Sequence, residues 1–590
     1  PKWIRGFSFA NTLNATANDD NDDARLGGGA IILKNYPSTG LVVEHFDFTL
    51  EDCTFHGFQT LFSGGAIYVE DVGARILFRN LRFTNNVAPE NGGALAIDSG
   101  SNVVLEAMTF VGNSAGEQGG ALAISSDAGA PSSVKVAGFT SSGDAAEHRG
   151  GALYVGRSST LELTSALVER ASVYSQSSGG GAAIALSSAK LTAVALEVRN
   201  ASAPHEAAVQ CKSSLLDMSG AKVLDTRGRG MSSTGCEIAL DESVFRGNTA
   251  SSDGGAMLLV SESELTVIES TFEKNNATGG DGGAIACLGC TLFKVTNSTF
   301  EGNTAARGGA LRLDTSQDSG GKFDVHSSTF QGNEALQGGG GVLYRVGPSA
   351  PRFDNTTLEN LEKAASNISQ GIFASNNARY QQARTGFASE AVTMSVKLNN
   401  TIVSGGTRLV VSNTKAITPP PVVILLDRYG SIVKDESQSL VISAASANSS
   451  IAPLLGKLNE AIQPESGEAN FLDLTLRGSP FHENSHSIVF SAKIENGGSG
   501  ALDVQMNLTV QKCGEGQWLS RVSALTGYLC EKCPQGKYGG DGSLDVKCTK
   551  CQLGLYQSEE GKARCEPARA GHYVDKLGAS NDLPCFKGTR

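Results

Sequence analysis

Residues 300–312 read Phe-Glu-Gly-Asn-Thr-Ala-Ala-Arg-Gly-Gly-Ala-Leu-Arg. A Phe-x-x-Asn element is followed here by Gly-Gly-Ala and an aliphatic residue. The same phrase recurs along the chain before residue 380, and the Gly-Gly pair begins five to seven residues after the Asn. In five further clear copies the leading aromatic residues are Phe83, Phe110, Phe245, Phe272 and Phe330. This recurrence of one short phrase decides the fold.

The copies are mostly 26 to 32 residues apart, which is typical of a solenoid, a propeller or another repeat array. Within a copy, segments such as residues 94–97 alternate in the manner of a β-strand. No 3.6-residue amphipathic pattern accompanies them, so the helical repeat classes are excluded. The position of Ala in Gly-Gly-Ala, which we call the Ala slot, is occupied in the clear copies by Ala30, Ala66, Ala94, Ala121, Ala152, Ala182, Ala256, Ala284, Ala310 and Val342. Two weaker copies fit near Ala208 and Cys236.

A coil with three short strands in each turn accommodates this period, and each turn then pairs in parallel with its neighbours. Identical residues stack from turn to turn, so the sequence predicts an internal column of Phe and a column of Asn at the turns. The Gly pairs suit positions with positive φ or crowded corners. About twelve rungs at about 4.8 Å give a rod of roughly 58 Å.

The composition excludes some partners and favours one compartment. The formal net charge is −12 and no basic run with interleaved aromatics occurs, so we expect no nucleic-acid partner. No apolar run reaches 18 residues, and we expect membrane anchoring only through sequence outside these 590 residues. The chain begins at Pro1 without a leader-like segment, so we interpret it as a mature or trimmed fragment.

Cysteines and sequons together favour an extracellular or cell-surface protein of the secretory pathway. Seven of the twelve Cys lie after residue 512. Nine Asn-x-Ser/Thr sequons are candidate N-glycosylation sites, namely Asn14, Asn200, Asn276, Asn297, Asn355, Asn367, Asn399, Asn448 and Asn507.

The combination of Phe-x-x-Asn and Gly-Gly-Ala-Ile/Leu/Val resembles the polymorphic outer-membrane-protein repeat, over roughly residues 27–376. The resemblance implies a right-handed parallel β-helix of the pectin-lyase-like type. Such repeats belong to surface adhesins in chlamydiae, and similar ones occur in large extracellular proteins of algae and protists. The chain departs from the chlamydial plan because other modules follow the repeats.

Residues 381–512 are predicted to form a β-sandwich, because seven alternating β-type runs with turn signals between them extend from Val392 to Val510. Residues 426–430 (Leu-Asp-Arg-Tyr-Gly) and 467–471 (Gly-Glu-Ala-Asn-Phe) resemble invasin- or filamin-like immunoglobulin repeats, which implies a spacer or adhesion unit. Asp427 fits a turn cap better than a Ca²⁺ ligand.

Residues 513–590 are predicted to be a small cysteine-rich region that depends on disulfides, because it has too little apolar sequence for a core. Its two CxxC pairs also allow a zinc ribbon. The run from Cys533 through Tyr538 to Cys565 resembles the ephrin-receptor-like module, which implies a disulfide-stapled extracellular stalk. Because seven Cys is an odd number, we expect the natural chain to continue past Arg590.

In the rod, Cys211 and Cys236 are about one rung apart, and stacked strands place such residues within disulfide reach. Cys287 and Cys290 form a CxxC for which we favour a local disulfide over a metal or redox site. Cys53 has no evident partner. The ten disulfide candidates are Cys211, Cys236, Cys287, Cys290, Cys513, Cys530, Cys533, Cys548, Cys551 and Cys565.

Three acids, Glu70, Asp98 and Asp314, lie four residues after the Ala slot. Only Glu70 and Asp98 fall on neighbouring rungs, where two stacked acids can hold Ca²⁺ or a sugar. We favour the interpretation that these acids are solvated charges at turns. The Phe, Asn and Gly-Gly residues of the repeat are interpreted as scaffold residues. The sequence therefore predicts no catalytic residue, no metal site and no cofactor.

These observations predict an all-β chain of three parts: a parallel β-helix over residues 1–380, an immunoglobulin-like sandwich over 381–512 and a cysteine-rich stalk over 513–590. We predict a non-enzymatic structural or adhesion protein that contacts other surface proteins or further copies of itself along the rod, in a cell coat or a flagellar or ciliary surface filament. The alternatives are a carbohydrate-binding or polysaccharide-cleaving β-helix, and the ectodomain of a membrane receptor or channel-associated protein.

Overall fold

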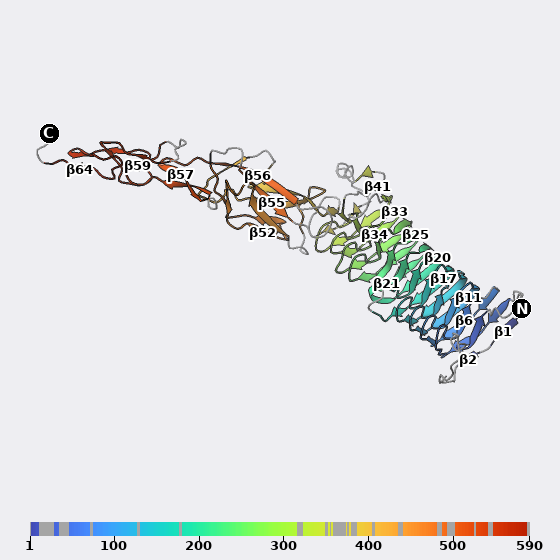
Figure 1. The fold of residues 1–590 in the computed structure, drawn as a ribbon. Coiled ribbons are helices and arrows are strands. Elements are labelled where there is room, and N and C mark those ends of the chain that lie inside the picture. Colours follow the sequence, from blue (N-terminus) through green and yellow to red (C-terminus); the bar gives the residue numbers. More distant parts are fainter. Residues whose placement is uncertain are drawn as a thin grey trace. The chain divides into compact units, whose positions relative to one another are not determined.

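A computed structural model describes residues 2–6, 8–10, 29–34, 47–70, 75–126, 130–175, 180–315, 322–347, 352–353, 356–357, 373–374, 377–378, 386–403, 408–434, 440–480, 486–492, 502–523, 527–540 and 547–586. Every regular element in these ranges is a β-strand. The chain divides into two compact units, Pro1–Glu390 and Ala391–Arg590. Figure 1 shows the first unit as a stack of rungs whose strands lie side by side.

A rung of the first unit is built from three strands where its long strand is continuous, and from four where that strand is divided in two, as β7 (Arg75–Arg79) and β8 (Arg82–Thr84) are. In one rung with three strands these are β11 (Asn102–Val111), the short β12 (Ser114–Ala115) and β13 (Leu122–Ile124). Each pairs in parallel with its counterpart in the next rung, β14 (Ser133–Ser142), β15 (Ala145–Ala146) and β16 (Leu153–Gly156). The described strands thereby form two long sheets, of 23 and 22 strands. This arrangement confirms the predicted coil of stacked rungs.

The predicted Phe column is confirmed at both ends of the rod. Phe55, Phe83 and Phe110 stack at one end, and Phe245, Phe272, Phe300 and Phe330 stack at the other, with ring centroids 4.7–5.3 Å apart. All seven side chains are fully buried. In the rungs between these two stacks, the equivalent position is occupied by Ser141, Val168, Val198 and Val223. Phe139, two residues before Ser141, contacts Phe110 and supplies the bulk that Ser141 lacks.

The predicted Asn column is a hydrogen-bonded ladder. The Asn303 amide Nδ2 donates to Asn333 Oδ1 at 2.9 Å and to the Phe272 carbonyl at 2.9 Å. Its Oδ1 accepts from Nδ2 and from the backbone N–H of Asn275, both at 3.0 Å. Every polar group of the buried side chain is thereby satisfied, which is the condition for placing an amide in a dry turn.

The Gly-Gly pair is required by close backbone approach. Gly92 has φ +65°, and a Cβ on it would lie 2.4 Å from the Leu95 carbonyl oxygen. A Cβ on Gly93 would lie 2.2 Å from the Gly120 carbonyl oxygen of the next rung. Gly92 also lies directly beside the Cβ of Ala96, which is buried. No residue larger than glycine fits between these backbones without displacing one of them.

The rod extends beyond the predicted boundary at residue 380. Strand β45 (Phe387–Ser389) pairs in parallel with β40 (Leu343–Val346), and the compact unit ends at Glu390. Phe387 stands in register with Leu343, and both side chains are buried. The chain therefore completes one more rung strand before the second unit, and this strand pairs with the otherwise open edge of β40.

The second unit begins with two sheets that share one buried cluster, in which the rings of Phe471 and Phe490 lie 5.0 Å apart. The four-stranded sheet contains β47 (Thr401–Ile402), β46 (Ala391–Leu398), β49 (Val422–Asp427) and β53 (Glu468–Asn470). The five-stranded sheet contains β48 (Arg408–Val411), β56 (Leu502–Val510), β55 (His486–Ala492), β50 (Val441–Ser446) and β52 (Asn459–Ala461). The immunoglobulin-like assignment stays a prediction.

The cysteine-rich region consists of two-stranded hairpins. The first is β57 (Gln517–Ser523) with β58 (Gly527–Lys532). Three shorter hairpins follow and pair antiparallel: β59 (Lys537–Tyr538) with β60 (Thr549–Lys550), β61 (Leu555–Tyr556) with β62 (Glu566–Pro567), and β63 (His572–Tyr573) with β64 (Leu583–Pro584).

We expect Asn303→Ala to destabilise the rod locally, because it removes hydrogen bonds to two neighbouring rungs. Each buried partner left unsatisfied costs roughly 1–3 kcal/mol. Hydrogen exchange measured by mass spectrometry should show faster exchange of the amides around Asn275 and Asn333. Glu301→Ala, at an exposed position of the same rung, is the control. Equal exchange in the two variants would contradict the ladder.

Candidate functional site

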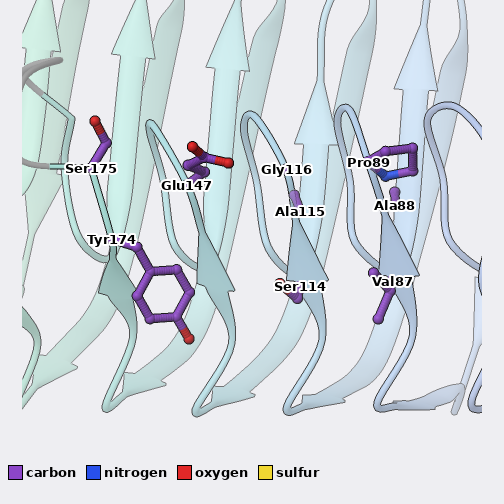
Figure 2. A pocket seen from close by; sticks show the side chains of 9 residues that line it. All are labelled: Val87, Ala88, Pro89, Ser114, Ala115, Gly116, Glu147, Tyr174 and Ser175. Atoms are coloured by element: carbon purple, nitrogen blue, oxygen red, sulfur yellow. The ribbon is translucent and has the colours of Figure 1, made fainter.

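One side of the rod carries a hollow of about 330 Å³, which we call the Tyr174 groove (Figure 2). It is lined by the short strands β9 (Val87–Ala88) and β12, and by residues that follow the short strands β15 and β18 (Ser172–Val173). The lining residues are Val87, Ala88, Pro89, Ser114, Ala115, Gly116, Glu147, Tyr174 and Ser175.

The groove exists because one slot of the repeat differs from rung to rung. Pro89, Gly116, Glu147 and Tyr174 each follow the short strand of their own rung. Gly116 leaves a gap in this column. A Cβ there would lie 2.0 Å from the Pro89 carbonyl oxygen, so the backbone allows no side chain to fill the gap.

The groove combines an aromatic ring with polar groups. Tyr174 is 68% exposed, which is unusual for so large a side chain. Figure 2 shows Tyr174 at one end of the row of lining residues, with its ring directed toward the neighbouring rung, which carries Glu147. Ser114 and Ser175 add hydroxyl groups, and Val87 adds an apolar wall. A stacking face with one carboxylate and two hydroxyls suits a ligand that has both an apolar face and hydroxyl groups.

A second hollow, of about 490 Å³, lies farther along the rod beside β24 (Arg227–Thr234) and β27 (Thr249–Ala250). It has no aromatic lining residue. Its lining residues are Asp225, Thr226, Arg227, Gly228, Gly247, Thr249, Ala250, Ser251 and Thr278. Of these two hollows, the Tyr174 groove is the one that is lined by an aromatic ring.

The two acids predicted to stack do lie in register, because β6 (Ile67–Glu70) pairs with β10 (Leu95–Asp98) and sets Glu70 opposite Asp98. Asp98 Oδ1 accepts hydrogen bonds from the Ser99 N–H at 2.9 Å and the Ser125 hydroxyl at 3.1 Å. Asp98 is thereby engaged in its own turn and with the next rung. Across the described ranges, no cluster of three or more His, Cys, Asp or Glu side chains suits a metal ion.

Two other acids are also engaged locally. Asp314 lies 3.6 Å from Arg312, on a rung remote in sequence from Glu70 and Asp98. In the second unit, Asp427 Oδ1 accepts from the N–H groups of Tyr429 and Ser431, so it caps a turn.

The structure pairs the candidate cysteines as Cys211–Cys236, Cys287–Cys290, Cys513–Cys530, Cys533–Cys548 and Cys551–Cys565. Cys53 is buried and Cys585 is exposed, and both are free thiols. Among the candidate glycosylation sites, Asn200, Asn297 and Asn399 are exposed, whereas Asn276, Asn448 and Asn507 are half-buried. Asn14, Asn355 and Asn367 lie outside the described residues. Glycosylation stays a prediction.

An ion-pair network on the Gly-Gly turns was missed by the sequence analysis. Arg307 makes two hydrogen bonds to the Asp281 carboxylate, at 2.9 and 3.0 Å, and lies over the Tyr344 ring at 4.6 Å. Arg312 lies 2.9 Å from Asp253 and 3.1 Å from Asp281. A signal is present in the sequence, since Asp253, Asp281 and Arg307 each directly precede a Gly-Gly pair. The network clamps successive turns.

Asp144 is a second feature that the repeat did not reveal, because it replaces Asn in the ladder. Its Oδ1 accepts from the Asn113 N–H at 2.7 Å and Nδ2 at 2.8 Å. Its Oδ2 accepts from the Ser141 hydroxyl at 2.6 Å. Burial raises the pKa of Asp144 to about 6, although these hydrogen bonds act in the opposite direction.

Comparison with known families supports the β-helix assignment of the first part of the chain and the ephrin-receptor-like resemblance of the last part. Residues 212–381 match a right-handed β-helix region, and residues 80–98 match the Chlamydia polymorphic membrane protein repeat. Residues 536–585 match the tyrosine-protein kinase ephrin type A/B receptor-like family. No curated protein and no solved structure gives a significant match. In the part of the chain that the structure describes, no helix is long and apolar enough to cross a membrane.

These findings describe a right-handed β-helix with a disulfide-rich C-terminal region, of a kind found in surface or extracellular proteins. The matches together cover less than half of the chain, so they indicate similarity to these families.

We expect Asp144→Asn to stabilise the rod at pH 7.5 by about 1–3 kcal/mol, since a buried charge is replaced by an amide. The pKa of about 6 exceeds the ordinary value of 3.8, so the folded state holds the Asp144 proton more tightly than the unfolded state does. The wild-type free energy of unfolding should therefore fall as the pH rises from about 4 to 6.

Unfolding followed by hydrogen exchange over β14 and β15 at pH 4 and pH 7.5 checks this expectation. The gain from Asp144→Asn should be large at pH 7.5 and small at pH 4. Asp217→Asn makes the same charge change at an exposed position and is the control. A gain that is independent of pH would contradict the assignment.

Proposed function

We propose that the protein is a non-enzymatic structural or adhesion protein of the cell surface or extracellular space, whose rod is a platform for protein–protein assembly. The observation that carries this proposal is the continuous stack of rungs, filled by columns of Phe, aliphatic and Asn side chains. A solenoid of this kind offers long lateral faces at a fixed spacing, which suits repeated contacts with further copies or other surface proteins.

The rest of the chain supports a connecting role. Disulfides staple both the rod and the cysteine-rich region, in keeping with an oxidising compartment. An immunoglobulin-like sandwich over residues 391–512 acts as a spacer in this proposal, and the cysteine-rich region acts as a stalk. A cell coat or a flagellar or ciliary surface filament is the setting that we favour.

Crosslinking mass spectrometry on native material tests the assembly. We expect intermolecular crosslinks from exposed lysines on the 23-stranded sheet of the rod, namely Lys135, Lys190 and Lys222. The partner peptides should come from this chain or from another surface protein. Recovery of the protein as a free monomer, with intramolecular crosslinks only, would contradict the proposal.

A second candidate function is carbohydrate binding in the Tyr174 groove. The exposed ring is the observation that favours it, because an aromatic face packs against the C–H face of a sugar ring. Glu147 accepts hydrogen bonds from sugar hydroxyls in this proposal.

We expect Tyr174→Ala to weaken retention on a glycan array or on immobilised pectin, alginate or glucan by at least tenfold, since about 2 kcal/mol of stacking and buried area is lost. Leu336→Ala is the matched control, because Leu336 follows the short strand β39 (Glu334–Ala335) in the same slot of another rung and is also exposed. Equal retention of both variants would eliminate the groove as the site.

The same polysaccharide panel tests the absence of enzymatic activity. We expect no cleavage products from the wild-type chain. Cleavage that is lost in Glu70→Ala or Asp98→Ala would overturn the proposal of a non-enzymatic protein, since those two acids lie in register on neighbouring rungs.

A further inference from the structure

The three short hairpins of the cysteine-rich region are copies of one unit. In each, a glycine with positive φ precedes the first strand, at Gly536, Gly554 and Gly571. The N–H after that glycine donates to the carbonyl three residues earlier in each unit, at 2.9–3.1 Å. The glycine carbonyl in turn accepts from the residue that follows the second strand, namely Cys551, Ala568 and Cys585. These equivalent contacts fix the alignment of the three units without reference to their cysteines.

In this alignment the first two hairpins are closed by disulfides at the same two slots. The first slot lies three residues before the glycine and the second directly precedes the return strand. Cys533 and Cys548 occupy the slots in the first hairpin, and Cys551 and Cys565 occupy them in the second. Their Cα atoms are 5.6 and 5.8 Å apart. In the third hairpin the two slots hold Ala568 and Asp582, so no disulfide is available there.

An ion pair occupies the place of the missing disulfide. The carboxylate of Asp582 accepts hydrogen bonds from the backbone N–H of Arg569 at 2.9 Å and from its Nε and Nη2 at 3.1 and 2.8 Å. The Asp582 side chain has no exposed surface, whereas the Arg569 side chain is 67% exposed. Arg569 directly follows Ala568, so this pair joins the same two chain segments that the disulfides join in the preceding hairpins.

We propose that the Arg569–Asp582 pair replaces the disulfide of the third hairpin, which therefore closes without an oxidant and opens when Asp582 loses its charge. A two-point guanidinium–carboxylate contact with an additional backbone N–H is stronger than hydrogen bonds between neutral groups, because the donor and the acceptor are both charged. Because an ion pair stands in place of a disulfide, the closure of the third hairpin is reversible. The two preceding hairpins stay locked until a reductant acts on them.

The electrostatics agree with this geometry. Hydrogen bonding by Arg569 holds the pKa of Asp582 below its usual range, and the nearby His572 acts in the same direction. Tyr556 is the other titratable group that acts on Arg569. Because the folded pKa is depressed, the stabilisation is present above the ordinary value of 3.8 and is lost as the pH falls below it.

Hydrogen exchange on the 590-residue chain tests the proposal with the variant Asp582→Asn, which removes the charge and keeps the size. We expect the amides of residues 568–585 to exchange at least tenfold faster than in the wild type, whereas those of residues 533–567 keep their rates. Glu559→Gln is the matched control, because it breaks an exposed pair with Lys562 in the second hairpin. Unchanged exchange of residues 568–585 in Asp582→Asn would overturn the proposal.

The double variant Ala568→Cys/Asp582→Cys gives an independent measurement. The two slots should form a disulfide, seen in the proteolytic peptides that carry positions 568 and 582 as a loss of about 2 Da on linkage, since two thiol hydrogens leave. Protection of residues 568–585 should match the wild type in the oxidised form and should fall on reduction. Failure of the disulfide to form, or protection that is the same in the reduced form, would show that the two slots do not close the hairpin.

Discussion

The parallel pairing of successive rungs is the constraint on which the whole first unit depends. Each strand hydrogen-bonds to the equivalent strand of the next rung in one register, so that residues such as Phe272 and Phe300 lie directly above one another. A residue at a given slot must therefore suit an identical neighbour above and below. Phe, which stacks, and Asn, which both donates and accepts, satisfy that condition, and a lone charge does not.

The positions at which one copy differs from the others account for the local features of the rod. Asp144 accepts hydrogen bonds from the backbone N–H and from Nδ2 of Asn113, as Asn does elsewhere in the ladder, but it carries a charge in a buried site. Ser141 leaves a gap in the Phe column, and Phe139 fills it from two residues away. Gly116 leaves a gap on the outside that nothing fills, and the Tyr174 groove is the result. Defects inside the rod are compensated, whereas defects outside become surface features.

The cysteine-rich region follows the same logic with a different bond. Its hairpins are too small for a core, so each needs one strong link between its two strands. Where the slots hold Cys, the link is covalent, and where they hold Ala568 and Asp582, the neighbouring Arg569 supplies an ionic one. In these three hairpins the connection between the two strands therefore keeps its position, whereas its chemistry changes from a disulfide to an ion pair.

The sequence alone determined the period, the strand character and the identity of the stacked columns, because those depend on residues that recur at a fixed spacing. It also placed Glu70 beside Asp98 and Cys211 within reach of Cys236, since both pairs are one rung apart. Only the tertiary structure decided what the divergent residues do. The exposure of Tyr174, the placement of Asp144 in the ladder, the clamp between Arg307 and Asp281, and the strand at 387–389 depend on which neighbour each residue meets across rungs. A repeat pattern carries no information at positions where the copies differ, and the shape of the surface is set at those positions.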